Sequence, residues 1–397
     1  MKKFMFLWIV VVVLGLFVFN THSVCAKVIG VTDKVIKIGA MGDVTGPGAD
    51  VYHGVIPGWR TYIRHINDQG GIHGRKIKFM IEDDRFSIPM ALSSFKKLVF
   101  RDKVFAFSWA ASGAGQTHAI IPLVEKQKMP MICGTNNSAY FNPVRRYVFT
   151  TLPFYEDQVE ILFDYLWKDL KVDHPKIALF YMESASSRPV LHLMRKLTKK
   201  HGVSLTELVI PIAGLDMSSQ VLLAKRAKPD YTFIHGYVGN TAAVLRDMKK
   251  FNLKTQIIAM QYGFVRKTVE IAKSAANDLK GINAFGSYTD DSPAMIKMRE
   301  IDKKYNPKIK YRDRNFIQGW LCSVILCEGL KNAGKDLNRE ALVDGWEKIK
   351  NFDTQGLCGV VNLGPDNHKT TDSSRIYKVD TKTLDFIPIT DWRKATN

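Results

Sequence analysis

The chain has 397 residues, 46% of them hydrophobic and 24% charged, which is enough for two domains with full cores and excludes a largely disordered protein. Its formal net charge is +19, but the basic residues are scattered rather than clustered in a recognisable nucleic-acid-binding module. A basic surface that faces an anionic wall, a membrane or an acidic partner is therefore a better interpretation than a nucleic-acid site.

The first 26 residues are predicted to be an export signal peptide. Lys2 and Lys3 precede an apolar run over residues 4–19, and residues 24–26 (VCA) fit a cleavage site. An uncleaved membrane anchor is the alternative, because the run is slightly long for a signal core. Lipidation of Cys25 is disfavoured by the bulk of the preceding valine. Cleavage would leave the protein periplasmic, or otherwise outside the cytoplasm, and removing two lysines would lower the net charge from +19 to +17.

The next region, from residue 35 to residue 84, has the pattern of a strand, a helix and a second strand. Residues 35–41 form an apolar strand, and a loop over residues 42–48 leads to an amphipathic helix that ends at Gly70 and Gly71. A second strand over residues 77–81 ends at Asp83 and Asp84. Adjacent strand residues point to opposite faces, so we interpret these two acids as surface and turn residues rather than a catalytic pair.

Residues 104–137 are predicted to form a strand, a small-residue loop, a helix, a second strand and a second small-residue loop. Both loops leave the carboxyl ends of parallel strands, the edge at which open α/β sheets bind ligands. Ordinary turns of such a sheet are the alternative interpretation. The candidate ligand-binding residues are Ser112, Gly113, Gln116 and Thr117 in the first loop, and Thr135 and Asn136 in the second.

The mature chain keeps four cysteines, Cys133, Cys322, Cys327 and Cys358, without the spacing of a zinc site. We expect no metal or cofactor. Export permits a disulfide from Cys358 to Cys322 or Cys327. The last two are five residues apart on one predicted helix, which disfavours their pairing with each other. Cys133 could be a thiol nucleophile near His118, although a small apolar lining residue is the better interpretation.

Several motifs carry a resemblance to a known family. They are IKIGAMGDVTGPGADVYHG, INDQGGIHGRKIKFMIEDD, KPDYTFIHGYVGNTAAVLRDMKKFNLK, FIQGWLCSVILCEGLKNAGKDL and NFDTQGLCGVVNLGPDNH. In order and spacing they resemble the extracytoplasmic solute-binding proteins of branched-chain amino-acid ABC transporters, the leucine/isoleucine/valine-binding family. The resemblance spans nearly the whole mature chain.

The resemblance implies the type I periplasmic binding protein fold, an α/β fold of two doubly wound Rossmann-like lobes joined by three crossings, with the ligand between the lobes. The strand and helix pattern restarts after residue 155 and returns after residue 286. We therefore expect crossings near residues 149–155, 284–288 and 355–361. Lobe one would comprise residues 27–152 and 287–357, and lobe two residues 153–286 and 358–397.

In the family, the loops of lobe one hold the ligand carboxylate through hydroxyls and backbone amides, and lobe two closes over it. An acidic residue pairs with the ammonium in amino-acid binders, but this chain has Gln261 at the matching position, which leaves Glu183 or nothing. An aromatic or aliphatic carboxylate or an amide is therefore a serious alternative ligand. The candidates from lobe two are Tyr155, Tyr181, Glu183, Tyr237, Gln261 and Tyr262.

The leading hypothesis is a monomeric, non-enzymatic binding protein that delivers an amino acid or a related small carboxylate or amide to an ABC permease. No GxSxG elbow, GxxxxGK[ST] phosphate loop or GxGxxG fingerprint occurs in the strand-to-helix turns. Two alternatives remain open at this point. One is a ligand sensor of the same fold coupled to a membrane receptor, and the other is a hydrolase that uses Cys133.

Overall fold

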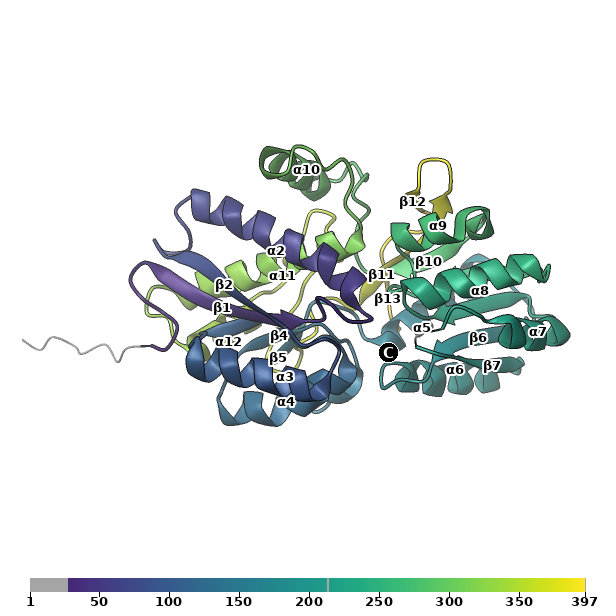
Figure 1. The fold of residues 1–397 in the computed structure, drawn as a ribbon, viewed down its shortest axis with the longest axis horizontal. Helices are drawn as coiled ribbons and strands as arrows, with labels where there is room; N and C mark the ends of the chain where they lie inside the picture. Colours follow the sequence, from purple (N-terminus) through teal and green to yellow (C-terminus); the bar gives the residue numbers. More distant parts are fainter. Residues whose placement is uncertain (1–27, 213, 397) are drawn as a thin grey trace, which may run out of the picture.

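The computed structural model describes residues 28–212 and 214–396, which form two lobes that lie end to end (Figure 1). The predicted signal peptide lies outside the described residues. Within the described ranges, no helix is both long enough and apolar enough to cross a membrane. Each lobe has its own sheet with helices on both faces, which confirms the expected α/β architecture of two doubly wound lobes.

The sheet of lobe one has five parallel strands in the order β2-β1-β3-β4-β5. Their bounds are β1 (Val35–Gly42), β2 (Lys76–Asp83), β3 (Ala106–Ala110), β4 (Met131–Cys133) and β5 (Val148–Thr150). The residues of β3, β4 and β5 are all buried, as expected for strands covered on both faces. The loops after β1, β2, β3 and β4 therefore leave one edge of the sheet, which faces lobe two.

Helices cover both faces of this sheet. On one face lie α2 (Ala49–Asp68), α11 (Arg314–Ala333) and α12 (Arg339–Glu347), with α10 (Pro293–Tyr305) packed on α2; the other face carries α3 (Ile88–Lys96), its π-helical extension (Lys97–Arg101) and α4 (Ala114–Lys126). The backbones of α2 and α11 approach closely at Gly319, where a Cβ atom would lie 2.1 Å from the Val55 carbonyl oxygen. Only glycine permits this contact.

The sheet of lobe two follows the order β12-β11-β10-β9-β8-β6-β7, with a short strand β13 paired to β11. The strands β6 to β10 are parallel, whereas β11 is antiparallel to both of its neighbours. The bounds are β6 (Ile177–Met182), β7 (Leu205–Ile210), β8 (Tyr231–His235), β9 (Gln256–Ala259), β10 (Lys280–Asn283), β11 (Ser373–Asp380), β12 (Asp385–Pro388) and β13 (Arg393–Lys394).

Two sets of helices sandwich the second sheet, and their buried residues form one cluster on each face. One set is α7 (Ser218–Ala227), α8 (Val238–Lys250) and α9 (Arg266–Ala272), and the other is α5 (Tyr155–Asp164), its π-helical extension (Tyr165–Asp169) and α6 (Ser187–His201). Short 3-10 helices cover Ser138–Tyr140 and Lys273–Ala276. Tyr237 is the residue immediately before α8, at the carboxyl edge of β8.

The chain passes between the sheets between β5 and α5, and again between β10 and α10. The third passage differs from the expected position near residues 355–361. Lys369 still pairs with Thr150 of β5, and the Thr370 amide donates to the Thr150 carbonyl oxygen over 2.9 Å. The side chains of Val361 and Leu363 belong to the core of lobe one. Residues 358–370 therefore stay with lobe one, because their backbone continues the edge of its sheet, and the chain joins the second sheet at β11.

The disulfide that export would permit does not form among the described residues. All four cysteines of the described chain are free thiols, and all are buried. The Cys358 thiol donates to the Gly359 carbonyl oxygen at 3.2 Å, and the Cys322 sulfur lies 3.2 Å from the Thr151 hydroxyl. Each of these two sulfurs therefore has its own polar partner, and Cys358 is a small core residue.

Candidate functional site

A small cavity lies between the two lobes, at the carboxyl edges of both sheets. Its volume is about 20 Å³. Lobe one lines it with Gly48, Val51, Tyr52, Phe86, Trp109, Ser112, Gly113, Ala114, Gly134 and Thr135, and lobe two with Tyr155, Ser186, Tyr237 and Tyr262. Aromatic rings and hydroxyls dominate this lining, and among the described residues that form it none carries a charged side chain.

Two buried polar side chains hold the first loop of lobe one in place. The Asp84 carboxylate is fully buried and accepts hydrogen bonds from the Ser112 amide at 2.8 Å and the Phe86 amide at 3.0 Å. The Gln116 side-chain amide donates to the Phe86 carbonyl oxygen at 2.5 Å. We interpreted Asp84 as a surface acid, which is wrong: it ties the loop after β2 to the loop after β3.

The wall from lobe one offers donors at the start of α4. Gly113 is the residue before this helix, so the first backbone amides of α4 lack partners within the helix, and the helix dipole favours an anion there. Beside them, the Ser112 and Thr135 hydroxyls are buried and have no hydrogen-bond partner of good geometry within the described chain, although the Asp84 carboxylate adjoins the first and the Tyr155 hydroxyl the second. This end of the cavity can therefore accept a carboxylate, which would satisfy several buried donors at once.

The wall from lobe two is aromatic. The Tyr262 hydroxyl crosses the cavity and donates to the Gly134 carbonyl oxygen at 3.1 Å. The Tyr237 ring packs edge-on against Phe86 of the opposite lobe, with 6.2 Å between ring centroids, and lies 6.1 Å from the Tyr262 ring. The Asn137 side chain also donates to the Ala185 carbonyl oxygen of lobe two at 3.0 Å. These contacts join the lobes directly across the cleft.

Burial keeps the phenol hydroxyls of the cavity protonated. It raises the pKa of Tyr262 to about 12, although the nearby Arg314 guanidinium opposes part of the rise. It also raises the pKa of Tyr237 and Tyr155 well above the ordinary value. At neutral pH all three hydroxyls are therefore hydrogen-bond donors as well as acceptors, and a carboxylate is a suitable acceptor for them.

The predicted site residues divide into two groups. Six of them line the cavity, whereas the other six do not. Gln116 and Asn136 are buried and hold loops, and Thr117 and Gln261 are buried behind the walls. Tyr181 is a half-buried residue of β6, away from the cavity, and Glu183 is exposed. The six that line the cavity are Ser112, Gly113, Thr135, Tyr155, Tyr237 and Tyr262. As ligand contacts, all twelve remain predictions.

Other residues at the cavity were not among the predicted ligand contacts. Phe86 follows β2 at the same sheet edge as Ser112. The rule that ligands bind at the carboxyl ends of parallel strands, which we call the strand-edge rule, could therefore have found it. Tyr52 lies in the first turn of α2, where no motif singles it out; its hydroxyl donates to the Ala111 carbonyl oxygen at 3.0 Å and accepts from the Trp109 indole at 2.5 Å. Trp109 packs under Gly134, where a Cβ atom would lie 2.1 Å from the indole ring. The loop after β4 can therefore follow this ring only with glycine at that position.

The thiol hypothesis receives no geometric support. Cys133 is fully buried, and burial raises the pKa of its thiol to about 12, so the thiolate is scarce at neutral pH. His118 is exposed and packs against the Tyr140 ring. Among the described residues, no group of three His, Cys, Asp or Glu side chains is arranged to hold a metal ion.

Comparisons with known proteins agree with this arrangement. The family model described as "Periplasmic binding protein" matches residues 35–383. A Leu/Ile/Val-binding protein homologue of Brucella abortus is 24% identical over 284 residues, which cover 70% of this chain and 73% of the Brucella protein.

Two solved structures have the same fold over 92% of this chain. One is a branched-chain amino-acid ABC transporter protein of Thermus thermophilus with bound valine (TM-score 0.84, 21% identity, 98% of that chain covered). The other is a fatty acid ABC transporter substrate-binding protein of Thermomonospora curvata (TM-score 0.83, 22% identity, 94% covered). With its two lobes, its cavity between them and the match over residues 35–383, the chain belongs to the periplasmic binding protein family.

Proposed function

We propose that this protein is the solute-binding subunit of an ABC importer, and that it captures a small carboxylate with an apolar or aromatic body between its two lobes. The observation that carries the proposal is the cavity at the carboxyl edges of both sheets, with hydroxyls that lack a partner of good geometry on one side and tyrosines on the other. The Brucella and Thermus relatives, whose names refer to branched-chain amino acids, support an importer role.

The lining favours a carboxylate over a zwitterionic amino acid. An ammonium group needs an acidic side chain or several carbonyl oxygens, and no acid is among the described residues that line the cavity. Glu183, the remaining acidic candidate, is exposed to solvent. A carboxylate instead finds the Ser112 and Thr135 hydroxyls and the start of α4. The Thermomonospora relative, named for fatty acids, is consistent with a ligand that lacks an ammonium group.

Ligand capture requires the lobes to open and close. The cavity has room for about one water molecule, which is far less than a leucine-sized molecule needs. Some contacts that join the lobes, such as Tyr262 with Gly134 and Tyr237 with Phe86, lie at the cleft itself. A ligand would replace them, and hinge motion at the three crossings would accommodate it.

We further propose that the protein acts without an enzymatic step, as a monomer outside the cytoplasmic membrane, with an ABC permease as its partner. Burial of Cys133 and the high pKa of its thiol support the absence of thiol chemistry. Family membership supports an extracytoplasmic location, because the family is described as periplasmic.

Thermal-shift screening tests this function directly. A ligand that binds only the folded protein stabilises it by roughly 2.7 kcal/mol at a hundredfold excess over Kd. This gain in the free energy of unfolding raises the melting midpoint. We expect shifts with short aliphatic or aromatic carboxylates, and smaller shifts with the matching amino acids. Calorimetry would then provide Kd. If no carboxylate, amide or amino acid in such a panel shifts the midpoint or binds in calorimetry, the proposed ligand class is wrong.

A further inference from the structure

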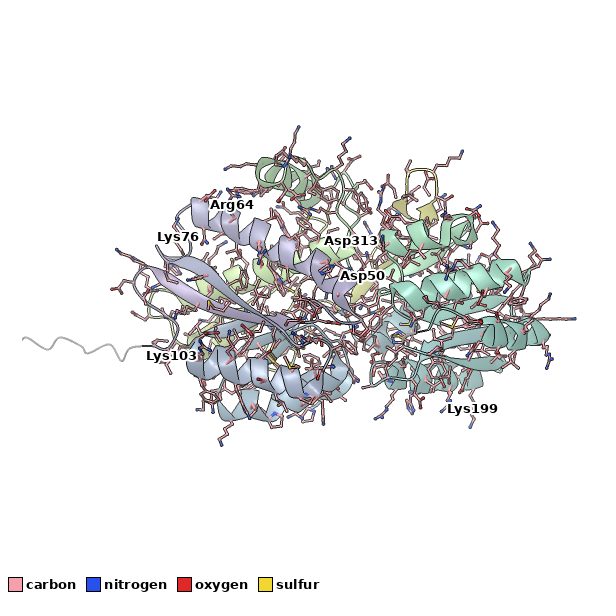
Figure 2. The ribbon with its side chains drawn as sticks, viewed as in Figure 1. Asp50, Arg64, Lys76, Lys103, Lys199 and Asp313 are labelled. Carbon is pink, nitrogen blue, oxygen red and sulfur yellow. The ribbon has the colours of Figure 1, made fainter. Side chains whose placement is uncertain are left out.

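Arg314 is a buried cation beside the proposed binding site. It is the first residue of α11 and only 5% exposed. Figure 2 labels the preceding residue, Asp313, on the lobe-one side of the boundary between the lobes, near Asp50 of α2. The guanidinium carbon lies 5.2 Å from the centre of the Tyr262 ring and 5.3 Å from that of Phe285. Arg314 therefore lies directly behind a tyrosine that lines the cavity.

The hydrogen bonds of Arg314 do not neutralise its charge. The guanidinium donates to the Asn315 and Gln318 side-chain oxygens at 3.0 and 2.8 Å, both neutral acceptors, and its Nε has no partner within the described chain. The Asp313 carboxylate accepts the Asn315 and Phe316 amides at 2.9 and 3.3 Å, so it favours the charged form of Arg314 from nearby without forming an ion pair with it.

Two other arginines show what a structural role looks like in this lobe. Arg312 is also largely buried, and it forms a two-pronged ion pair with Asp302 at 2.8 and 2.9 Å. Arg339 donates to three backbone carbonyl oxygens, those of Phe105, Gln127 and Val104. Arg314 has neither arrangement. The atoms that contact its guanidinium are neutral, and the Asp313 carboxylate acts on it only from beyond ion-pair distance, so a carboxylate arriving from outside would stabilise this buried charge.

We infer that Arg314 is the residue that makes the cleft select anionic ligands, acting on a bound carboxylate from behind the wall formed by Tyr262 and Tyr155. This inference rests on the proposed function and specifies the part of it that concerns charge. The positive charge polarises the phenol hydroxyls toward donation and attracts a carboxylate at short range in a site with little water. It repels an ammonium group equally, which adds a second reason for discrimination against amino acids.

The test compares carboxylates with amides of the same shape. The probes are 4-methylpentanoate with 4-methylpentanamide and leucine, and 3-phenylpropanoate with 3-phenylpropanamide and phenylalanine. Each is measured by calorimetry on the mature protein and on the variants Arg314→Met, Arg314→Lys and Arg312→Met. Met keeps the apolar stem without the charge, and Lys keeps the charge without the planar group. The melting midpoint of each protein without probe is recorded as well.

We expect Arg314→Met to lose at least tenfold in affinity for the carboxylates, which corresponds to about 1.4 kcal/mol, while amide affinity changes less than twofold. Arg314→Lys should recover most of the carboxylate affinity. Without probe, Arg314→Met should melt at or above the wild-type midpoint, whereas Arg312→Met, which leaves the buried Asp302 unpaired, should melt several degrees lower. A role limited to folding would not change the preference for carboxylate over amide.

Three results would overturn the inference. If Arg314→Met binds the carboxylates as tightly as the wild type, Arg314 does not select charge, and the proposed function stands without it. If the wild type prefers the amides or the amino acids, the inference fails together with the proposed preference for carboxylates, while the role as a solute-binding subunit stands. If the wild type binds none of the six probes, the proposed ligand class fails, and the inference fails with it.

Discussion

The two walls of the cleft are built in different ways. In lobe one, buried side chains brace the loops: Asp84 and Gln116 bond the loops after β2 and β3 to each other. In lobe two, the wall consists of Ser186 and three tyrosines, of which Tyr237 meets lobe one through a ring edge, Tyr262 through its hydroxyl and Tyr155 through its backbone amide. The first wall is pre-organised for a polar group, whereas the second reaches the cavity with side chains from the opposite lobe. The same fold thus provides one fixed and one closing surface.

The largest expected effect is on the bracing of lobe one. Asp84→Ala would leave the buried Ser112 and Phe86 amides without their acceptor, and hydrogen bonds to a charged group contribute about 1.5–3 kcal/mol each. We expect the free energy of unfolding to fall by about 4 kcal/mol in urea denaturation. Asp83→Ala is the comparison variant: its carboxylate also accepts backbone amides, those of Val44 and Arg85, but it is more exposed, so we expect a smaller loss. An equal loss in the two variants would mean that Asp84 has no special role in bracing the loop.

The next prediction concerns lobe two, where a histidine is buried behind Tyr155. His235 packs edge-on against that ring, and burial lowers its pKa from 6.5 to about 4. The unfolded chain binds the proton more readily, so this residue's contribution to stability is complete above pH 6.5 and is lost as the pH falls toward 4. We expect a loss of about 3 kcal/mol over that range.

Urea unfolding of the wild type and His235→Asn across pH 4–7 checks this prediction. Removing the titrating ring should flatten the pH dependence in the variant, while the other histidines contribute equally to both proteins. Parallel curves would show that His235 is accessible to protons in the folded state.

Tyr237→Ala separates a closing residue from a core residue. Tyr237 is half-buried and meets Phe86 of the opposite lobe. We expect affinity for the best carboxylate to fall roughly thirtyfold, about 2 kcal/mol, with the apo melting midpoint nearly unchanged. The control is Tyr377→Ala in the core of lobe two, where truncation of a fully buried aromatic costs about 3–5 kcal/mol of stability. If Tyr237→Ala resembles this control and keeps its affinity, Tyr237 is a structural residue.

The smallest effect is expected from Thr135→Val, which keeps the shape of the side chain but removes its hydroxyl. That hydroxyl is buried, lines the cavity and has no partner of good geometry in the described chain. Loss of one hydrogen bond to a carboxylate costs about 1.5 kcal/mol, so calorimetry should report a Kd about tenfold higher. Stability should not fall, since an unsatisfied buried hydroxyl is removed. An unchanged Kd would exclude Thr135 from the binding site.

Local pattern in the sequence was enough for the architecture. The apolar strands, the glycine-containing turns and the amphipathic helices predict two doubly wound lobes, because side-chain periodicity and turn chemistry are local properties. The strand-edge rule also led to Ser112, Thr135 and Tyr237, since the carboxyl ends of parallel strands meet at one edge. The same rule selected Glu183, which follows β6 but remains exposed, because it does not specify where a side chain points.

Tertiary packing decided the rest. Residues 358–370 remain with lobe one through backbone pairing with β5, which no local pattern reveals. Asp84 looked like a turn acid, yet the fold buries it against a loop 28 residues away. Arg314 follows Arg312 and Asp313 in the sequence, and only the meeting of α11 with Tyr262 of the other lobe shows which of the two arginines lies beside the cleft. Burial and charge pairing depend on contacts between distant segments, so the sequence alone determined the lobes and the strand edges, whereas the structure determined the chemistry of the cleft.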